Sequence, residues 1–192
     1  MTPQTRYTQV AIILHWLIAL GVIGLIVAGK WMAGAINQPE TQALAYDVFQ
    51  LHKSVGITVL LLTILRLAWR LGHRPPPLPD AMPGWQKAAA TGAHWLFYLL
   101  LIGIPLSGWA LVSASPLGLP TLLYGVVEWP HIAALTHVAD RQATAHQLEE
   151  VHELLGNAML LLVLLHVAAA LKHQYLDRDN LLARMLPFLA RG

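Results

Sequence analysis

The chain has 192 residues, of which 56% are hydrophobic and 11% are charged, and its net charge is +2. Soluble proteins carry about 25% charged residues, so this composition indicates an integral membrane protein, and the few scattered basic residues give no sign of nucleic-acid binding. Cysteine is absent, which excludes thiolate-held iron–sulfur clusters, covalently attached c-type haem and structural disulfides.

Four apolar segments are long enough to cross a hydrocarbon core, for which about 20 residues suffice. We predict a single domain over 1–192 with spans at 8–27, 49–71, 88–112 and 151–171. The first segment lacks the basic n-region and the cleavage site of a signal peptide and is predicted to remain as a helix. Pro105, inside the third segment, predicts a kink or a local break. The predicted fold is all-α, an integral membrane four-helix bundle.

The connectors between the spans differ in composition. Residues 72–85 are rich in proline and predict a stiff linker, whereas residues 113–150 form a long, partly helical connector able to cover one membrane face. Nine of the twelve Lys and Arg residues lie at the N-terminus, around the second connector or at the C-terminus. Cytoplasmic segments are enriched in Lys and Arg, so both termini are predicted to be cytoplasmic and the 113–150 connector to face outward.

Two histidines, His152 and His166, stand fourteen residues apart at the two ends of the last apolar segment. On an α-helix, fourteen residues return to within roughly 40° of the starting direction after about 21 Å. Imidazoles inside a membrane are costly and are retained for function. The spacing therefore predicts two planar cofactors bound at two depths.

A low-spin b-type haem takes two axial nitrogens from opposite sides, so each of these histidines needs a partner on another helix at matching depth. The first apolar segment offers His15 near its cytoplasmic end, and the second offers His52 near its outer end. Depth then pairs His15 with His166 and His52 with His152. The prediction is four iron ligands and two haem b.

Other polar residues near the ends of the spans are candidates for secondary roles. His173 shares a face with His166 but lies at the water interface, so His173 and His94 are predicted to contact a haem edge or a quinone. Haem propionates are anions that favour Arg and Lys nearby. The candidates are Lys53 for the outer haem and Arg6, Arg66 and Arg70 for the inner haem. The alternative explanations are positive-inside topology or interface anchoring for the basic residues, and a capping or interfacial role for His94.

Three glycines, Gly56, Gly92 and Gly156, are predicted to admit a macrocycle or a neighbouring helix close to the backbone. The pair His152-Glu153 does not form a zincin motif, because position 156 is glycine where that motif has its second histidine. One alternative without haem stays open at this point, a small transporter or proton channel whose histidines titrate within the membrane.

Several motifs occur in an order that resembles the bacterial cytochrome b561 family, over nearly the whole chain. They are HW at His15, LHKSVG at His52, RLAWR before the proline-rich connector, GAHWLFYLL, PLSGW, His152, His166, ALKHQY and DNLLARM. The family consists of four-helix, two-haem proteins of the bacterial cytoplasmic membrane and is similar to the cytochrome b subunits of nickel–iron hydrogenases. The resemblance implies that His15, His52, His152 and His166 are the haem ligands.

The resemblance also implies a function. A multi-pass protein of the bacterial inner membrane, with residues 113–150 in the periplasm, would exchange electrons with the quinone pool. The family includes a superoxide oxidase that passes electrons from superoxide through both haems to ubiquinone, which implies an oxidoreductase of this type. The alternative is a haem-bearing membrane anchor and electron-transfer subunit for a partner dehydrogenase or periplasmic protein. A homodimer is compatible with the sequence.

Overall fold

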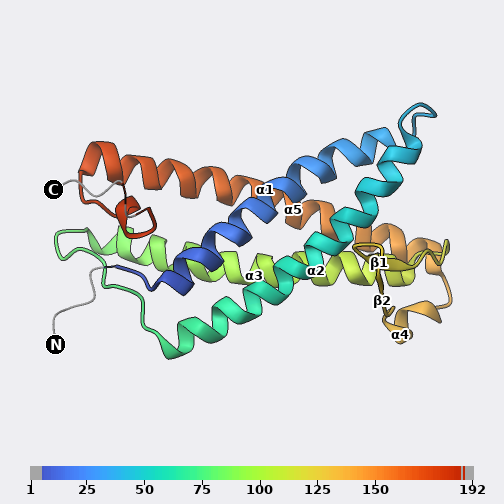
Figure 1. The fold of residues 1–192 in the computed structure, drawn as a ribbon, viewed down its shortest axis with the longest axis horizontal. Coiled ribbons are helices and arrows are strands. Elements are labelled where there is room, and N and C mark those ends of the chain that lie inside the picture. The colour runs from blue at the N-terminus through green and yellow to red at the C-terminus, as the bar shows by residue number, and fades with distance from the viewer. Residues whose placement is uncertain (1–5, 187, 189–192) are drawn as a thin grey trace.

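Four long helices build most of the molecule, in a computed structural model that describes residues 6–186 and 188 (Figure 1). They are α1 (Gln9–Ala35), α2 (Gln42–Gly72), α3 (Gly84–Ala114) and α5 (Arg141–Lys172). All four are long and apolar enough to cross a membrane. The predicted all-α membrane bundle is therefore confirmed.

Smaller elements lie at the two ends of the bundle. Strands β1 (Thr121–Leu123) and β2 (Val127–Trp129) form an antiparallel hairpin in which Leu123 pairs with Val127, and the short helix α4 (Ala133–Thr136) follows. We call this the hairpin end. At the opposite, termini end, α1 begins and α5 continues into a π-helical turn (His173–Asp177), followed by a 3-10 turn (Leu182–Arg184) (Figure 1).

The helices extend beyond the apolar segments from which they were predicted. Helix α1 begins at Gln9, where the Thr8 hydroxyl accepts a hydrogen bond from the Ala11 amide at 3.3 Å, and continues past the predicted end at residue 27 to Ala35. The largest extension is in α5, which begins at Arg141, ten residues before the predicted span. Asp140 caps this polar turn by accepting from the Ala143 amide at 2.9 Å. Hydropathy locates the part of a helix that fits a bilayer, whereas capping groups decide where the helix begins.

Of the kink or local break predicted at Pro105, the break does not occur, because α3 runs as one helix from Gly84 to Ala114. Proline removes one backbone hydrogen bond and crowds the preceding turn. The remaining helical bonds hold the turn together, since a membrane offers no water to replace them.

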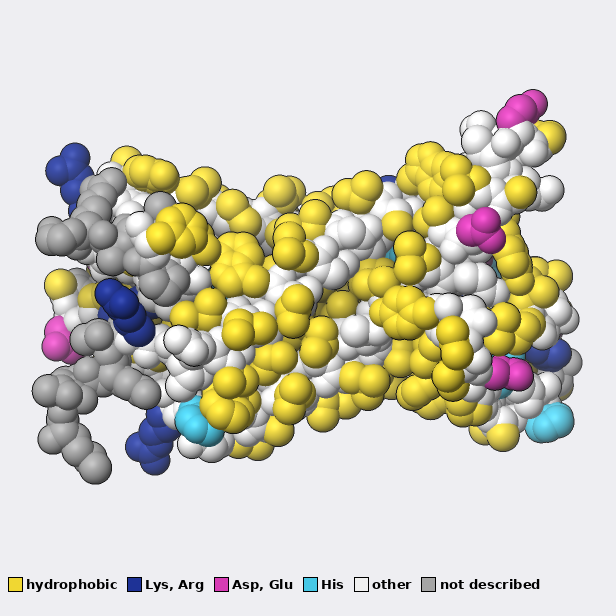
Figure 2. Space-filling view, viewed as in Figure 1, with side chains coloured by type: hydrophobic (Ala, Val, Ile, Leu, Met, Phe, Trp, Pro, Cys, Tyr) yellow, Lys and Arg dark blue, Asp and Glu magenta, His cyan; other side chains and the backbone are white. Residues whose placement is uncertain are grey.

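The four helices form two closely packed pairs. α1 packs along α2, and α3 packs along α5, while α2 also contacts α3. Figure 1 shows the α1–α2 pair crossing the α3–α5 pair at an angle. The core lies in the middle of the bundle and consists of Ile18, Val22, Val59, Leu100, Leu101, Met159 and Leu162. Figure 2 shows a broad apolar surface over the middle of the helices, as expected for side chains that face lipid.

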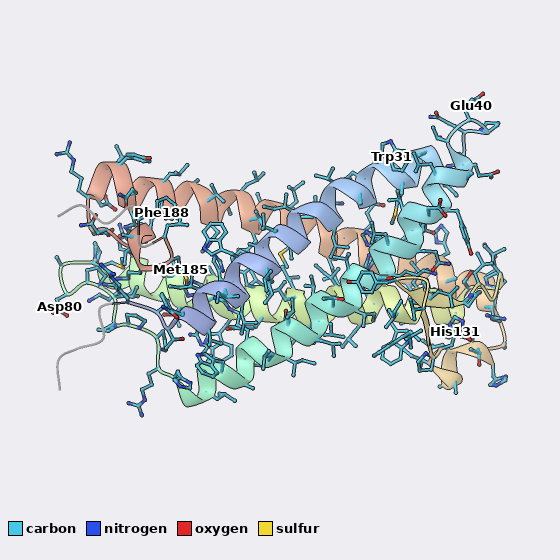
Figure 3. The ribbon with its side chains drawn as sticks, viewed as in Figure 1. Trp31, Glu40, Asp80, His131, Met185 and Phe188 are labelled. Atoms are coloured by element: carbon cyan, nitrogen blue, oxygen red, sulfur yellow. The ribbon has the colours of Figure 1, made fainter. Side chains whose placement is uncertain are left out.

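The chain after α5 turns back over the termini end. The Trp16 indole N–H donates to the Met185 carbonyl at 3.0 Å, which ties this segment to α1. The Arg184 guanidinium donates to the Pro77 carbonyl at 2.6 Å, which ties it to the proline-rich connector. In Figure 3, Met185 and Asp80 lie at this end, whereas Glu40 and His131 lie at the other.

Candidate functional site

Two histidines face each other near the hairpin end, one from α2 and one from α5. The ring centroids of His52 and His152 are 6.3 Å apart and their planes make an angle of 72°. Near the termini end, His15 of α1 and His166 of α5 have centroids 6.4 Å apart at 69°. We call these the hairpin-end pair and the termini-end pair.

The separation within each pair suits two ligands on one metal ion. An imidazole nitrogen binds a transition metal at about 2 Å, and the ring centroid lies about 1 Å further back, so two opposed ligands have centroids roughly 6 Å apart. Both pairs have this spacing. The structure thus brings together the four histidines that the sequence pairs by depth, while their role as iron ligands stays a prediction.

The two pairs lie at different levels of the bundle. His152 and His166 are fourteen residues apart in the continuous helix α5, which corresponds to about 21 Å along its axis. Buried core residues of the same helix, Met159 and Leu162, lie between them. An apolar layer therefore separates the two candidate metal positions.

A third histidine lies at the termini end. The His94 ring, from α3, has its centroid 6.0 Å from that of His166, so distance alone would also allow this pair to bind a metal. A macrocycle between two ligands, however, needs space between the helices that carry them. Among the described residues, α3 packs along α5, whereas α1 makes little direct contact with α5. This packing favours His15 as the partner of His166 and leaves His94 beside the pair.

Hydrogen bonds fix the orientation of the His152 ring. Its Nδ1 lies 2.9 Å from the Ser107 hydroxyl and 3.1 Å from the Ile104 carbonyl, while the Ser107 hydroxyl donates to the same carbonyl at 2.8 Å. These acceptors favour a proton on Nδ1, which leaves the lone pair of Nε2 free to bind a metal. Ligating histidines in metalloproteins are commonly held in this way by their second nitrogen.

Two glycines lie beside the rings of the hairpin-end pair. A Cβ atom at Gly108 of α3 would come 3.0 Å from Cε1 of His152, which is too close without movement of the ring. A Cβ atom at Gly29 of α1 would lie 3.4 Å from Cε1 of His52. A side chain at Gly108 would therefore displace the His152 ring, whereas a Cβ atom at Gly29 would make an ordinary van der Waals contact with the His52 ring.

The His52 ring has an unused buried nitrogen. Within the described part of the chain, its Nδ1 is buried and has no hydrogen-bond partner. Buried polar atoms normally have partners, so an orphaned ring nitrogen distinguishes His52 from an ordinary core histidine. By the pair spacing, the hydrogen bonds that orient His152 and the lack of a side chain at Gly108, the residues present fit a bis-histidine haem.

A basic cavity lies at the termini end between α1, α2 and α3. Its cationic lining residues are Arg66, Arg70 and Arg74, and no acidic residue lines it among those that the structure describes. The Arg66 guanidinium donates to the Ala11 carbonyl at 3.2 Å, one helical turn from His15. The Arg70 guanidinium stacks 5.7 Å from the Tyr98 ring centroid. Arg66 and Arg70 are thus placed where they could meet an anionic group of a cofactor.

The other two cationic candidates are placed differently. The Lys53 ammonium, next to His52 in the sequence, donates to the Pro120 carbonyl at 3.1 Å and so holds the connector between α3 and α5. An ammonium has three N–H donors, so this bond leaves two of them for a propionate. Arg6 is exposed at the start of the described chain and does not line the basic cavity.

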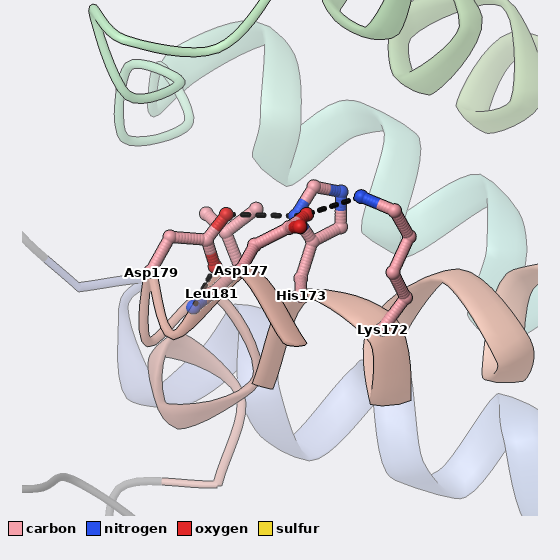
Figure 4. Close-up of polar contacts among 5 residues, drawn as sticks. All are labelled: Lys172, His173, Asp177, Asp179 and Leu181. Atoms are coloured by element: carbon pink, nitrogen blue, oxygen red, sulfur yellow. Dashed lines mark hydrogen bonds and ion pairs between the residues drawn. The ribbon is translucent and has the colours of Figure 1, made fainter. Parts of the chain in front are cut away.

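His173 lies in a network of charged groups in the turn after α5 (Figure 4). Its Nδ1 is 2.7 Å from a carboxylate oxygen of Asp179 and 3.0 Å from one of Asp177, and Asp177 also pairs with Lys172. The His173 imidazole and the carboxylates of Asp177 and Asp179 are close enough together to bind a metal ion. The Lys172 ammonium already neutralises Asp177, so we interpret the group as an ion-pair network that orients His173.

The groups that position the histidines were not predicted from the sequence. Ser107 and Gly108 lie in the PLSGW motif, and a polar residue next to a glycine inside an apolar helix was the available signal. The glycines that were singled out, Gly56, Gly92 and Gly156, have no described atom within 4 Å of an added Cβ. Helix packing therefore gives no reason for glycine at those three positions.

The chain is similar to known proteins over nearly its whole length. The family model described as prokaryotic cytochrome b561 matches residues 6–188. The chain is 34% identical to cytochrome b561 homolog 2 of Escherichia coli (strain K12), over 96% of this chain and 93% of that protein. It is 31% identical to the probable superoxide oxidase CybB of Yersinia pestis (95% and 96%) and 33% identical to cytochrome b562 of Cereibacter sphaeroides (97% and 98%).

Proposed function

The chain belongs to the prokaryotic cytochrome b561 family, and on this premise we propose that it conducts electrons across a bacterial inner membrane through two bis-histidine b haems. Membrane electron transfer with b-type haem follows from the family. The number of haems, their ligands and the exchange of electrons with the quinone pool are our proposal. The observation that carries it is the pair of facing histidines at each end of the bundle, with centroids 6.3 and 6.4 Å apart.

The side chains have distinct roles in this proposal. When bound, the two haems would accept and give up single electrons at the two levels of the bundle. His52 and His152 would hold one iron, and His15 and His166 the other. Ser107 keeps the His152 ring turned so that Nε2 is free. The apolar layer between the pairs excludes water and ions from the path.

Quinone exchange is proposed at the termini end, near the inner haem. A quinone becomes a quinol by taking up two electrons and two protons, so its site needs polar groups that bind its oxygens and move protons. His94 lies beside His166, with ring centroids 6.0 Å apart. His173 is seven residues beyond His166, about 10 Å along the helix, and Asp179 accepts its Nδ1–H, leaving Nε2 for a quinone oxygen.

Two classes of electron donor are candidates, superoxide and a protein partner. Similarity to a probable superoxide oxidase supports superoxide, of which two anions would supply two electrons and release two molecules of O₂. A periplasmic partner or dehydrogenase would instead dock on the outer connector, in which Glu128, Asp140, Glu149 and Glu150 are acidic. Rapid haem reduction by superoxide in the purified protein supports the first donor, and slow reduction that a co-purifying subunit accelerates supports the second.

The haem count tests the central claim. Protein purified from membranes should contain two haems b per chain in a pyridine haemochrome assay, because each histidine pair holds one iron. A redox titration should resolve two components. Colourless protein without a Soret band would reject the conduit and favour a haem-free transporter.

Histidine substitutions test the pairing. His52→Ala and His152→Ala should each remove the hairpin-end haem and spare the other, whereas His15→Ala and His166→Ala should do the reverse. His94→Ala is the matched control, because it removes a ring 6.0 Å from His166 that we do not assign to the iron. Loss of a haem in His94→Ala with retention of both in His15→Ala would show that the termini-end pair is assigned wrongly.

A further inference from the structure

The β1–β2 hairpin is held to one side of α2 by polar contacts. The Pro120 carbonyl, just before β1, accepts hydrogen bonds from the Gln50 side-chain amide at 3.2 Å and from the Lys53 ammonium at 3.1 Å. The Gln50 side-chain oxygen also accepts from the Leu122 amide at 3.5 Å. Side chains of α2 thus form hydrogen bonds with backbone groups in and just before the first strand.

The same pattern continues to the tip of the hairpin. The Ser54 hydroxyl, which is fully buried, accepts from the Tyr124 amide at 3.0 Å and shares its proton between the Gln50 carbonyl at 2.9 Å and the Leu122 carbonyl at 3.3 Å. The Tyr124 and Thr58 hydroxyls are 2.7 Å apart. Within the tip, the Gly125 amide donates to the Leu122 carbonyl, and the Val126 amide donates to the Leu123 carbonyl. Non-helical backbone can enter an apolar medium only when its polar groups are satisfied in this way.

The depth of the tip follows from its partners on α2. In α5, Glu153 and Lys172 are the charged residues that bound the apolar stretch, and nineteen residues correspond to about 29 Å, close to the thickness of a hydrocarbon core. Glu153 follows His152, which faces His52, and Ser54 is two residues further into the membrane than His52. The tip backbone therefore lies at the edge of the apolar zone, and the Tyr124 ring extends inward to Thr58.

The tip presents apolar side chains to its surroundings. Val126 is 82% exposed, Tyr124 58% and Val127 57%. The charged residue of the hairpin, Glu128, pairs with Leu122, one step further from the tip than the Leu123–Val127 pair. Figure 2 shows that the apolar surface of the bundle continues to the hairpin end. An apolar tip with one tyrosine, next to the lipid-facing surface, is typical of segments at a membrane interface.

We infer that the β1–β2 hairpin is a lipid anchor, with the tip formed by Tyr124, Gly125 and Val126 inserted at the boundary between headgroups and acyl chains. The occupant is lipid rather than a second copy of the chain, because the exposed side chains extend the same surface that the four spans present to the bilayer. The anchor holds the β1–β2 hairpin at the membrane beside His52 and leaves α4 and the residues between α4 and α5 in water.

Single-cysteine variants test this directly, because the chain has no native cysteine. Val126→Cys and, as a matched control, Ala139→Cys change exposed residues of the same connector. Ala139 precedes His152 by thirteen residues and lies on the water side. Each variant is purified with its haem, reconstituted in lipid nanodiscs that expose both membrane faces, and labelled with a nitroxide. Electron paramagnetic resonance then compares collisions with oxygen, which concentrates in lipid, and with a water-soluble nickel chelate.

The expected result is a ratio of oxygen to nickel collisions several-fold higher at position 126 than at position 139. Equal ratios would overturn the inference. A high ratio that appears only in discs with two copies, together with spin–spin broadening, would also overturn it in favour of a contact between copies. The experiment depends on the membrane spans and not on the proposed electron path, and an unchanged haem spectrum shows that each variant is folded.

Discussion

Gly108 shows how one residue can control a cofactor site that it does not ligate. We predict that Gly108→Val displaces the His152 ring, because a Cβ atom alone would already lie 3.0 Å from its Cε1. The hairpin-end haem should be lost and haem content should fall to about one per chain, with the termini-end haem spectrum unchanged. Haemochrome assays and redox titrations of the purified protein measure this.

Gly103→Val is the control for this substitution, since it adds the same β-branched residue to the same helix at a position with no described atom within 4 Å. It should retain both haems. Full haem content in Gly108→Val would mean that His152 does not hold an iron in the orientation found here.

At the residue level, sequence reasoning selected the histidines but not the groups that orient them. His15, His52, His152 and His166 are recognisable because imidazoles are rare inside apolar segments and stand at informative spacings. The Ser107 contact with His152 joins residues 45 positions apart, so it depends on how α3 and α5 pack. A local pattern carries no information about such a contact.

At the level of elements, α5 sets the spacing between the two histidine pairs, because it carries one histidine of each pair. We predict that inserting one alanine between Leu164 and Leu165 turns His166 by about 100° and moves it by about 1.5 Å relative to His152. Both flanking leucines are exposed, so the insertion does not open the core. The termini-end haem should be lost while the hairpin-end haem remains, as measured by visible spectra and redox titration.

An alanine inserted between Glu149 and Glu150 is the matched control. It lengthens the same helix but leaves the spacing from His152 to His166 intact, and both residues are exposed. This variant should bind both haems. If the first insertion also bound both with normal potentials, α5 could not supply a ligand to each.

At the level of the whole molecule, the distribution of charge predicts the orientation in the membrane. Lys and Arg are concentrated at the termini end, so we predict that this end faces the cytoplasm. Green fluorescent protein fused to the C-terminus should fluoresce, and alkaline phosphatase fused there should be inactive. The opposite pattern would place the termini in the periplasm and the proposed quinone site at the outer face.

The sequence by itself determined the four spans, the depth of each histidine and the candidate pairs, because hydropathy and helical periodicity are local properties that act along one helix at a time. Only the tertiary structure decided what lies between the helices. Close packing of α3 on α5 favours His15 over His94, Gly108 admits the His152 ring, and Ser54 fastens the hairpin to α2. These features depend on the rotation and pairing of helices distant in sequence, which no single segment encodes.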